Sequence, residues 1–286
     1  MKELKADGDV KIYPYDKGAG LVRIPKPEAI RKIEEQIGST EIIDKDPTPS
    51  LTRKFQTTLR QLKQEGKFTD AEYKQLYPSD PIPPRMYGVV KAHKPEKNYP
   101  MRIVVSTIGT PSYKTSENVV RIIQPTLNKN ETRLKNSRTF ADTAKTWPIH
   151  AEEVQVSYDV VNLYPSVPTK EATGIIIQIL SKDKELKNRT QLKLSDIKTL
   201  IELCLSKCYF LWEGNIYLLK NSAPIGLALM VVIAEAFLQY HENNAINAAL
   251  QYNLPVAPKS FLRYVDDSHA RFKDHEIAAT FHNILN

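Results

Sequence analysis

The amino-acid sequence predicts an α+β fold, in which helices cover one face of an antiparallel sheet. Three features of the C-terminal half lead to this prediction. Apolar and polar residues alternate over residues 154–158, which predicts a half-buried strand. Apolar residues then recur at helical spacing over residues 197–208, and a long apolar helix is expected over residues 224–251. A hairpin around residues 264–267 follows that helix.

The N-terminal half contains further strand and helix patterns. Strands are expected at residues 11–13 and 21–24, around the turn Asp16-Lys17-Gly18, and a helix at residues 27–37. We expect Ser50 to cap a helix that carries Leu51, Phe55, Leu59 and Leu62 on one side.

Four prolines in residues 78–84 mark a boundary. Strands at residues 87–91 and 102–106 and a helix at residues 113–123 are expected after it. Asp159 ends the strand at residues 154–158, and a helix is expected at residues 169–180. Ser195 is expected to cap the next helix, before a hairpin at residues 209–219.

The composition is that of a globular protein with an excess of basic residues. The chain has 286 residues and a net charge of +7, which favours an anionic partner, nucleic acid first and a membrane surface second. The longest apolar run, residues 225–234, is shorter than the ~20 residues that span a bilayer, so we expect no membrane-spanning segment. Of the two anionic partners, nucleic acid is the one that we expect, and no membrane. Cys204 and Cys208 have no second pair of ligands, which favours two buried thiols over a zinc site.

The tetrapeptide Tyr264-Val265-Asp266-Asp267 places two acids side by side between apolar, strand-forming residues. Adjacent carboxylates repel each other, and a divalent cation is the usual compensation. Polymerases hold metal ions in this way to activate a 3′-hydroxyl and to stabilise the leaving group. An ordinary Asp-Asp turn in a hairpin is the alternative, and the tetrapeptide alone leaves both open.

Other segments resemble a known family when they are taken in order. Residues 157–168, Ser-Tyr-Asp-Val-Val-Asn-Leu-Tyr-Pro-Ser-Val-Pro, resemble the first catalytic motif of reverse transcriptases of the Penelope-like retroelement family, and residues 264–267 resemble the second. Residues 87–95 and 101–114 resemble the fingers motifs of that family, and residues 16–18 an N-terminal element. The ordered set covers most of the chain.

This resemblance implies a right-hand polymerase fold with fingers and a palm, the palm being the antiparallel sheet with helices on one face. The implied division is an N-terminal extension with fingers helices at residues 1–84, fingers at 85–156 and an incomplete palm at 157–286. We expect a fragment from which the thumb and any GIY-YIG endonuclease are absent.

The resemblance also implies a metal site. Asp159 and Asp266 would hold two Mg²⁺ ions, with Mn²⁺ as a possible substitute, and the Val160 carbonyl could add an oxygen ligand. Asp267 would support the site. Asp159 and Asp266 are 107 positions apart (266 − 159), so only a fold that pairs their strands brings them together. The alternative for Asp159 is a cap of the following turn.

Three residues resemble the family's nucleotide-binding positions. Lys91 and Arg102 would grip the incoming triphosphate, although each could be an ordinary exposed basic residue. The bulky ring of Tyr164 would pack under the sugar and exclude a 2′-hydroxyl, which implies a deoxynucleotide substrate. The alternative for Tyr164 is a core aromatic residue.

The remaining implied contacts lie around two later segments. Pro224 and Tyr264 would contact the template or primer, and Gly226 would let the backbone approach the nucleotide. Here the chain departs from the family, because Leu227 stands where a second proline is usual and Met230-Val231 replaces a small-polar pair.

The implied function is an RNA-directed DNA polymerase that adds deoxynucleotides to a primer 3′-hydroxyl by two-metal chemistry. Its partners would be an RNA template, a DNA primer and deoxynucleoside triphosphates, and the family resemblance implies action in the nucleus. Two alternatives stay open. One is a catalytically inactive nucleic-acid-binding remnant, and the other is an RNA-directed RNA polymerase, against which Tyr164 argues.

Overall fold

The computed structural model describes residues 9–38, 40–161, 163–219, 226–251 and 256–286. The chain divides into two compact units, and each unit is built from two segments of the chain. The first unit comprises Met1–Asn118 and Thr199–Met230, and the second comprises Val119–Lys198 and Val231–Asn286.

Two sheets lie in the first unit. A hairpin pairs β1 with β2, and a larger sheet has the order β3-β8-β7-β4-β5. Only the contact between β4 and β7 is parallel among its described pairs. The strands are β1 (Val10–Pro14), β2 (Leu21–Pro25), β3 (Thr40–Ile43), β4 (Arg85–Val90), β5 (Met101–Ser106), β7 (Tyr209–Trp212) and β8 (Asn215–Leu219). These strands confirm the patterns expected from the sequence in this part of the chain, except that β3 is an additional strand that no pattern predicted.

The helices of this unit are α1 (Lys26–Ile37), α2 (Thr48–Gln64), α3 (Asp70–Leu76), a 3₁₀ turn η2 (Pro95–Lys97) and α9 (Leu194–Leu205), whose first residues belong to the second unit. Of these, α1 packs against β1, β2 and β5, and α2 packs against α3. The expected apolar face of α2 is confirmed, because Leu51, Phe55, Leu59 and Leu62 are buried.

Two expected helix caps are wrong. α2 begins at Thr48, so Ser50 lies inside it, and Asp46 accepts hydrogen bonds from the Thr48 backbone and side chain instead. α9 begins at Leu194, so Ser195 lies inside it, and the Asp196 carboxylate accepts from the Lys193 backbone. In both cases a nearby aspartate satisfies the N-terminal backbone better than the serine does.

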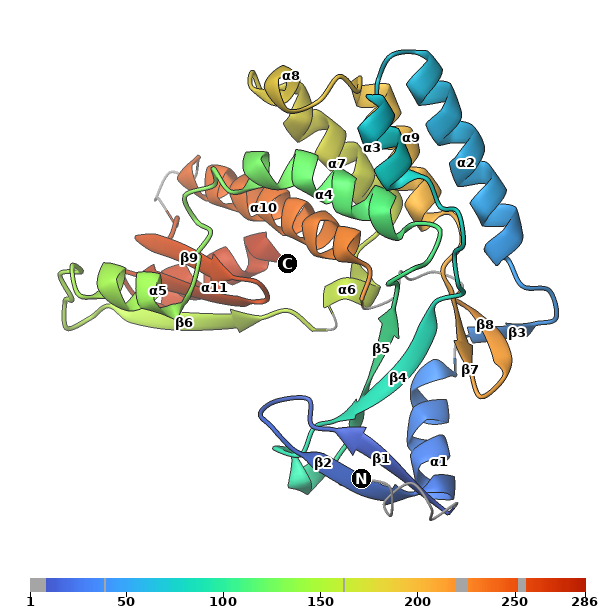
Figure 1. Cartoon of the computed structure of the whole chain (residues 1–286). Helices are drawn as coiled ribbons and strands as arrows, with labels where there is room; N and C mark the ends of the chain where they lie inside the picture. Colours follow the sequence, from blue (N-terminus) through green and yellow to red (C-terminus); the bar gives the residue numbers. More distant parts are fainter. Residues whose placement is uncertain (1–8, 39, 162, 220–225, 252–255) are drawn as a thin grey trace. The chain divides into compact units, whose positions relative to one another are not determined.

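The second unit contains the sheet that the sequence predicts. β6 (Val154–Asp159), β10 (Asp267–Phe272) and β9 (Ser260–Tyr264) lie in the order β6-β10-β9, and both pairings are antiparallel (Figure 1). The helices are α4 (Tyr113–Leu127), α5 (Ser137–Ala144), α6 (Leu163–Ser166), α7 (Thr169–Ser181), α8 (Leu186–Arg189), α10 (Ala228–Leu250) and α11 (His275–Leu285). α4 and α10 begin in residues of the first unit.

One face of this sheet packs against α10 and α11. Phe261 and Phe272 of the sheet form a buried cluster with Ala249 of α10 and Phe281 of α11. The α+β fold class is therefore confirmed, with an antiparallel sheet and helices on one face. The expected first residue of the long helix, Pro224, lies outside the described residues, and α10 is seen from Ala228.

The two cysteines are free thiols in the first unit. Cys204 is buried in α9, while Cys208 follows the end of that helix, and burial raises the pKa of Cys208 to about 11. Among the described residues, no helix has the length and apolar character that crossing a membrane requires.

Candidate active site

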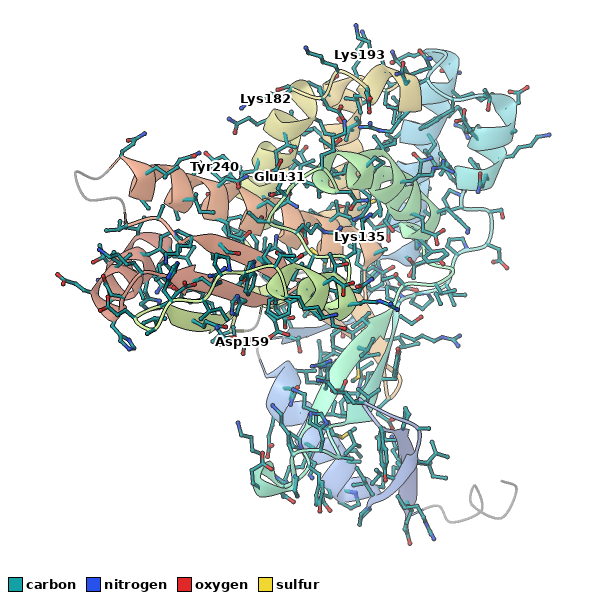
Figure 2. All side chains as sticks on the ribbon, turned by 90° about the vertical axis from the view of Figure 1, so that its left-hand side faces the viewer. Glu131, Lys135, Asp159, Lys182, Lys193 and Tyr240 are labelled. Carbon is teal, nitrogen blue, oxygen red and sulfur yellow. The ribbon has the colours of Figure 1, made fainter. Side chains whose placement is uncertain are left out.

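Strand pairing in the second unit brings the expected carboxylates together. In the register of β10 against β6, Asp267 lies opposite Asp159, and Asp266 is its neighbour in the hairpin turn. Side chains opposite each other in an antiparallel pair have Cβ atoms about 4.5–5.5 Å apart. Two distant parts of the chain therefore contribute acids to one end of the sheet, where Figure 2 labels Asp159 at the end of β6.

The turn that carries Asp266 has a strained backbone. Tyr264 and Asp267 are paired, so Val265 and Asp266 form a two-residue loop, and Val265 has φ +59°. Such tight hairpins require positive φ, which glycine or asparagine normally supplies. A β-branched residue in this region costs on the order of 1–3 kcal/mol and persists only where the surroundings fix it. Strain of this kind is characteristic of functional sites.

A buried arginine forms a hydrogen bond with the backbone of this turn. The Arg263 side chain is 1% exposed, and its Nη1 donates a hydrogen bond of 2.9 Å to the Val265 carbonyl oxygen. The same guanidinium donates to two acids of α10, with Nε 2.6 Å from Glu242 and Nη2 2.9 Å from Glu235. The strained turn is thus tied to α10 through one side chain.

The two acids of this network differ in their electrostatics. Burial raises the pKa of Glu242 to about 7, against the lowering effect of Arg263. Burial also acts to raise the pKa of Glu235, but hydrogen bonds and charge from Arg263, with help from Gln239 and Arg133, lower the pKa overall. Glu235 is therefore the firmly ionised partner, and Glu242 is the acid most sensitive to loss of Arg263.

The carboxylates at the end of the sheet lie open to solvent. Asp159 and Asp267 are exposed and Asp266 is half-buried, and no described cation forms an ion pair with any of them. Carboxylate oxygens with an adjacent carbonyl are the donors that Mg²⁺ prefers, so Asp159, Asp266 and the Val160 carbonyl fit that ion chemically. Within the described part of the chain, no group of three or more His, Cys, Asp or Glu side chains is gathered for a metal ion.

Asp267, His269 and Arg271 alternate with the residues of β10 that lie in the buried cluster with α10 and α11, and they therefore lie on the opposite face of the sheet. Side chains cover this face away from Asp267. His269 stacks on Trp147, with centroids 5.4 Å apart, and Phe140 of α5 meets both rings edge-on. Arg271 lies over Trp147 at 4.6 Å and pairs with Glu153. Asp159 and Asp267, at the other end of this face, are exposed. No sequence pattern predicted the aromatic cluster.

Tyr164 follows β6 in the second unit. It lies in the short helix α6 and is half-buried, five positions after Asp159. A half-buried ring at this place is compatible with both a sugar contact and a packing role. Tyr264, at the mouth of the turn, is 47% exposed, as a nucleic-acid contact requires.

The two basic nucleotide-binding candidates lie together in the first unit. Lys91 directly follows β4, and Arg102 lies in β5 opposite Val89. Burial lowers the pKa of Lys91, and the charges of Arg102 and Lys94 lower it further. The Arg102 guanidinium is 44% exposed and forms an ion pair of 3.0 Å with Asp16 of the N-terminal element.

Gly226 occupies a position that only glycine fits. Its φ is +123°, and an added Cβ would lie 2.1 Å from the Val105 carbonyl oxygen of β5. Thr107 donates a hydrogen bond of 3.2 Å to the Gly226 carbonyl oxygen. The backbone here is held against β5 in the first unit. The neighbouring expected contact, Pro224, lies outside the described residues.

Comparisons with known proteins show that the fold is similar to that of polymerases. No protein-family model matches the chain, and no curated protein sequence matches it. Among solved structures, telomerase from Candida albicans, in complex with a TWJ fragment of telomeric RNA, is similar with a TM-score of 0.62 and 11% identity, over 99% of this chain and 48% of that chain. The corresponding Candida tropicalis complex has a TM-score of 0.63 and 10% identity, over 95% of this chain and 44% of that one.

A viral polymerase is also similar. The BmCPV RNA-dependent RNA polymerase in its quiescent state has a TM-score of 0.51 and 14% identity, over 89% of this chain and 24% of that chain. These likenesses fit the expected polymerase fold of fingers and palm. The chain spans less than half the length of these telomerase chains.

Proposed function

We propose that this chain is the core of an RNA-directed DNA polymerase, a reverse transcriptase of a Penelope-like retroelement. The observation that carries the proposal is the meeting of Asp159 with the strained turn of Asp266 and Asp267 at one end of the palm sheet. The telomerase-like fold supports the polymerase class, and the ordered motifs support the retroelement lineage. Its site of action would then be the nucleus.

The chain's own groups divide the work of nucleotidyl transfer. Asp159, Asp266 and the Val160 carbonyl would hold two Mg²⁺ ions, which when bound supply charge stabilisation for the attacking 3′-hydroxyl and the leaving pyrophosphate. Asp267 would orient the turn. Lys91 and Arg102 would bind the triphosphate, the arginine through its paired donors and the lysine as a point charge.

Other residues would select the nucleotide substrate and contact the nucleic acid. Tyr164 would pack against the sugar and reject a 2′-hydroxyl, so deoxynucleotides would be used. Gly226 would allow close approach of the backbone to the nucleotide, and Tyr264 and Pro224 would contact the RNA template or DNA primer. Positioning carries most of this chemistry, because the protein forms no covalent bond to the substrate.

Primer extension on an RNA template tests the proposal. We expect Mg²⁺-dependent incorporation of deoxynucleotides, by this chain or by a longer version of the protein that contains it. Binding of primer–template that weakens with salt, without incorporation by either version, would instead identify an inactive remnant.

A second candidate, an RNA-directed RNA polymerase, is favoured by the likeness to the BmCPV enzyme. Replacing Tyr164 by valine separates the two candidates. For a reverse transcriptase, the wild type should discriminate against ribonucleotides, and Tyr164→Val should relax that discrimination by about tenfold or more. Equal use of both nucleotide types by the wild type would favour the RNA polymerase.

A further inference from the structure

The Asp16-Lys17-Gly18 element has no role in the proposed mechanism, yet it lies against the β4–β5 hairpin that carries the basic residues. Tyr15 forms a parallel bridge with Val90 at the end of β4, and the Asp16 amide donates a hydrogen bond of 2.8 Å to the Val90 carbonyl oxygen. Figure 1 shows the β1–β2 hairpin beside that end of β4. The backbone of Asp16 is therefore fixed against Val90, the residue that precedes Lys91.

The Asp16 side chain is buried and only partly satisfied. It is 5% exposed, and one carboxylate oxygen lies 3.0 Å from Nη1 of Arg102. The other oxygen is buried with no hydrogen-bond partner among the described residues. A buried carboxylate with an unused oxygen is a poor way to gain stability, because desolvation is repaid only when the group is fully paired.

Arg102 presents the opposite situation. Its side chain is 44% exposed, and its guanidinium carries five N–H donors, of which those on Nη1 lie nearest to Asp16 in the ion pair of 3.0 Å. The rest are left for a ligand of matching geometry, and phosphate oxygens match the guanidinium fork.

The surroundings are strongly basic. Burial lowers the pKa of Lys91, the charges of Arg102, Lys94 and Lys97 lower it further, and Asp16 is the acid that acts in the opposite direction. Without that acid, like charges would push the half-exposed arginine away from its neighbours.

We propose that Asp16 is a positioning residue for triphosphate binding, which fixes the Arg102 guanidinium so that its free donors face the phosphates beside Lys91. This inference rests on the proposed function, because it deepens the role given there to Lys91 and Arg102. The N-terminal element thereby gains a part in substrate binding without touching the substrate.

A positioning role for Asp16 and a simple effect of net charge predict opposite changes in anion binding when Asp16 is replaced. Removing a negative charge from a basic cluster should strengthen anion binding if only net charge matters. If Asp16 positions Arg102, Asp16→Asn should weaken binding, because an amide retains the shape of the carboxylate but loses the ion pair.

Calorimetric titration of the 286-residue chain with inorganic tripolyphosphate tests this. We expect Asp16→Asn to weaken binding by about fivefold to tenfold, which is the size of a typical coupling between contacting residues. In an Arg102→Gln background, Asp16→Asn should cause no further weakening. Glu96→Gln is the matched control, since it removes an exposed acid from η2 of the same hairpin and should leave binding unchanged or slightly tighter.

Several outcomes would overturn the inference. One is tighter binding in Asp16→Asn, and another is an equal loss with and without Arg102. If Asp16→Asn fails to fold, Arg102→Lys gives a second reading, because it retains the charge beside Asp16 but lacks the fork and should also weaken binding. Absence of tripolyphosphate binding by the wild type would refute both this inference and the assigned role of Lys91 and Arg102. Binding that is intact and indifferent to Asp16 would leave the proposed function standing.

Discussion

Arg263→Met should both destabilise the second unit and abolish catalysis. The substitution removes the donors to Glu242 at 2.6 Å, to Glu235 at 2.9 Å and to the Val265 carbonyl oxygen at 2.9 Å. Glu235 retains Gln239 at 2.7 Å and Arg133 at 3.3 Å, whereas Glu242 loses its cation. Most of the cost therefore falls on Glu242.

The magnitude depends on pH in a definite direction. Removing one partner of a buried ion pair costs about 3–5 kcal/mol. Burial already raises the pKa of Glu242 to about 7 from a usual value of 4.5, and loss of Arg263 should raise it further. A raised folded pKa gives stability that is present below the usual pKa and is lost as the pH rises through the folded value. The cost should therefore be larger at about pH 8 than at about pH 5.5.

Chemical denaturation at both pH values measures the cost, and primer extension measures the effect on the turn. The control is Arg263→Met combined with Glu242→Leu, since replacing a buried ion pair by apolar residues restores much of the stability. This double variant still cannot donate to the Val265 carbonyl oxygen, so we expect stability to recover and extension to stay impaired.

Two results would refute this reasoning. One is a loss of stability below about 1 kcal/mol at both pH values, the range of an exposed ion pair. The other is recovery of extension in the double variant, because the hydrogen bond to the turn would then be dispensable.

Three further outcomes are expected. Gly226→Ala should lower the melting temperature of the first unit, because the new Cβ would meet the Val105 carbonyl oxygen at 2.1 Å; an unchanged melting curve would contradict that geometry. Arg271 holds the pKa of Glu153 at about 2, so this pair should stabilise the fold above the usual value of 4.5 and lose its effect as the pH falls towards 2. When unfolding is followed as the pH is lowered, Glu153→Gln should not show the loss of stability that the wild type shows between about pH 4.5 and pH 2. Tyr164→Val should raise ribonucleotide use relative to the wild type, measured in competition with the matching deoxynucleotide.

The sequence was sufficient where a local pattern fixes the geometry. Alternation predicted β6, and the Asp pair flanked by apolar residues predicted the hairpin of β9 and β10. Helix starts were harder, because many serines lie near helix ends. The aspartates at 46 and 196 fix the actual starts, and their effect depends on the backbone geometry of the preceding turn.

The buried polar contacts were not predictable from one sequence. An arginine before a catalytic motif looks like an exposed base unless its partner is known. The available signal was a pair of acids, Glu235 and Glu242, seven positions apart on the long helix and thus on one face. Similarly, Asp16-Lys17-Gly18 indicated only a turn, because its partner Arg102 lies in a different strand.

Asp159 is expected to be part of a metal-dependent nucleotidyl-transfer site. The most direct test is single-nucleotide incorporation with Mg²⁺ on a primed RNA template, by this chain or by a longer version of the protein that contains it. It should compare the wild type with Asp159→Asn and with Asp142→Asn, an exposed acid of α5 in the same unit. We expect Asp159→Asn to lose incorporation by on the order of a thousandfold, while Asp142→Asn retains it. Incorporation by Asp159→Asn at the wild-type rate would contradict the account.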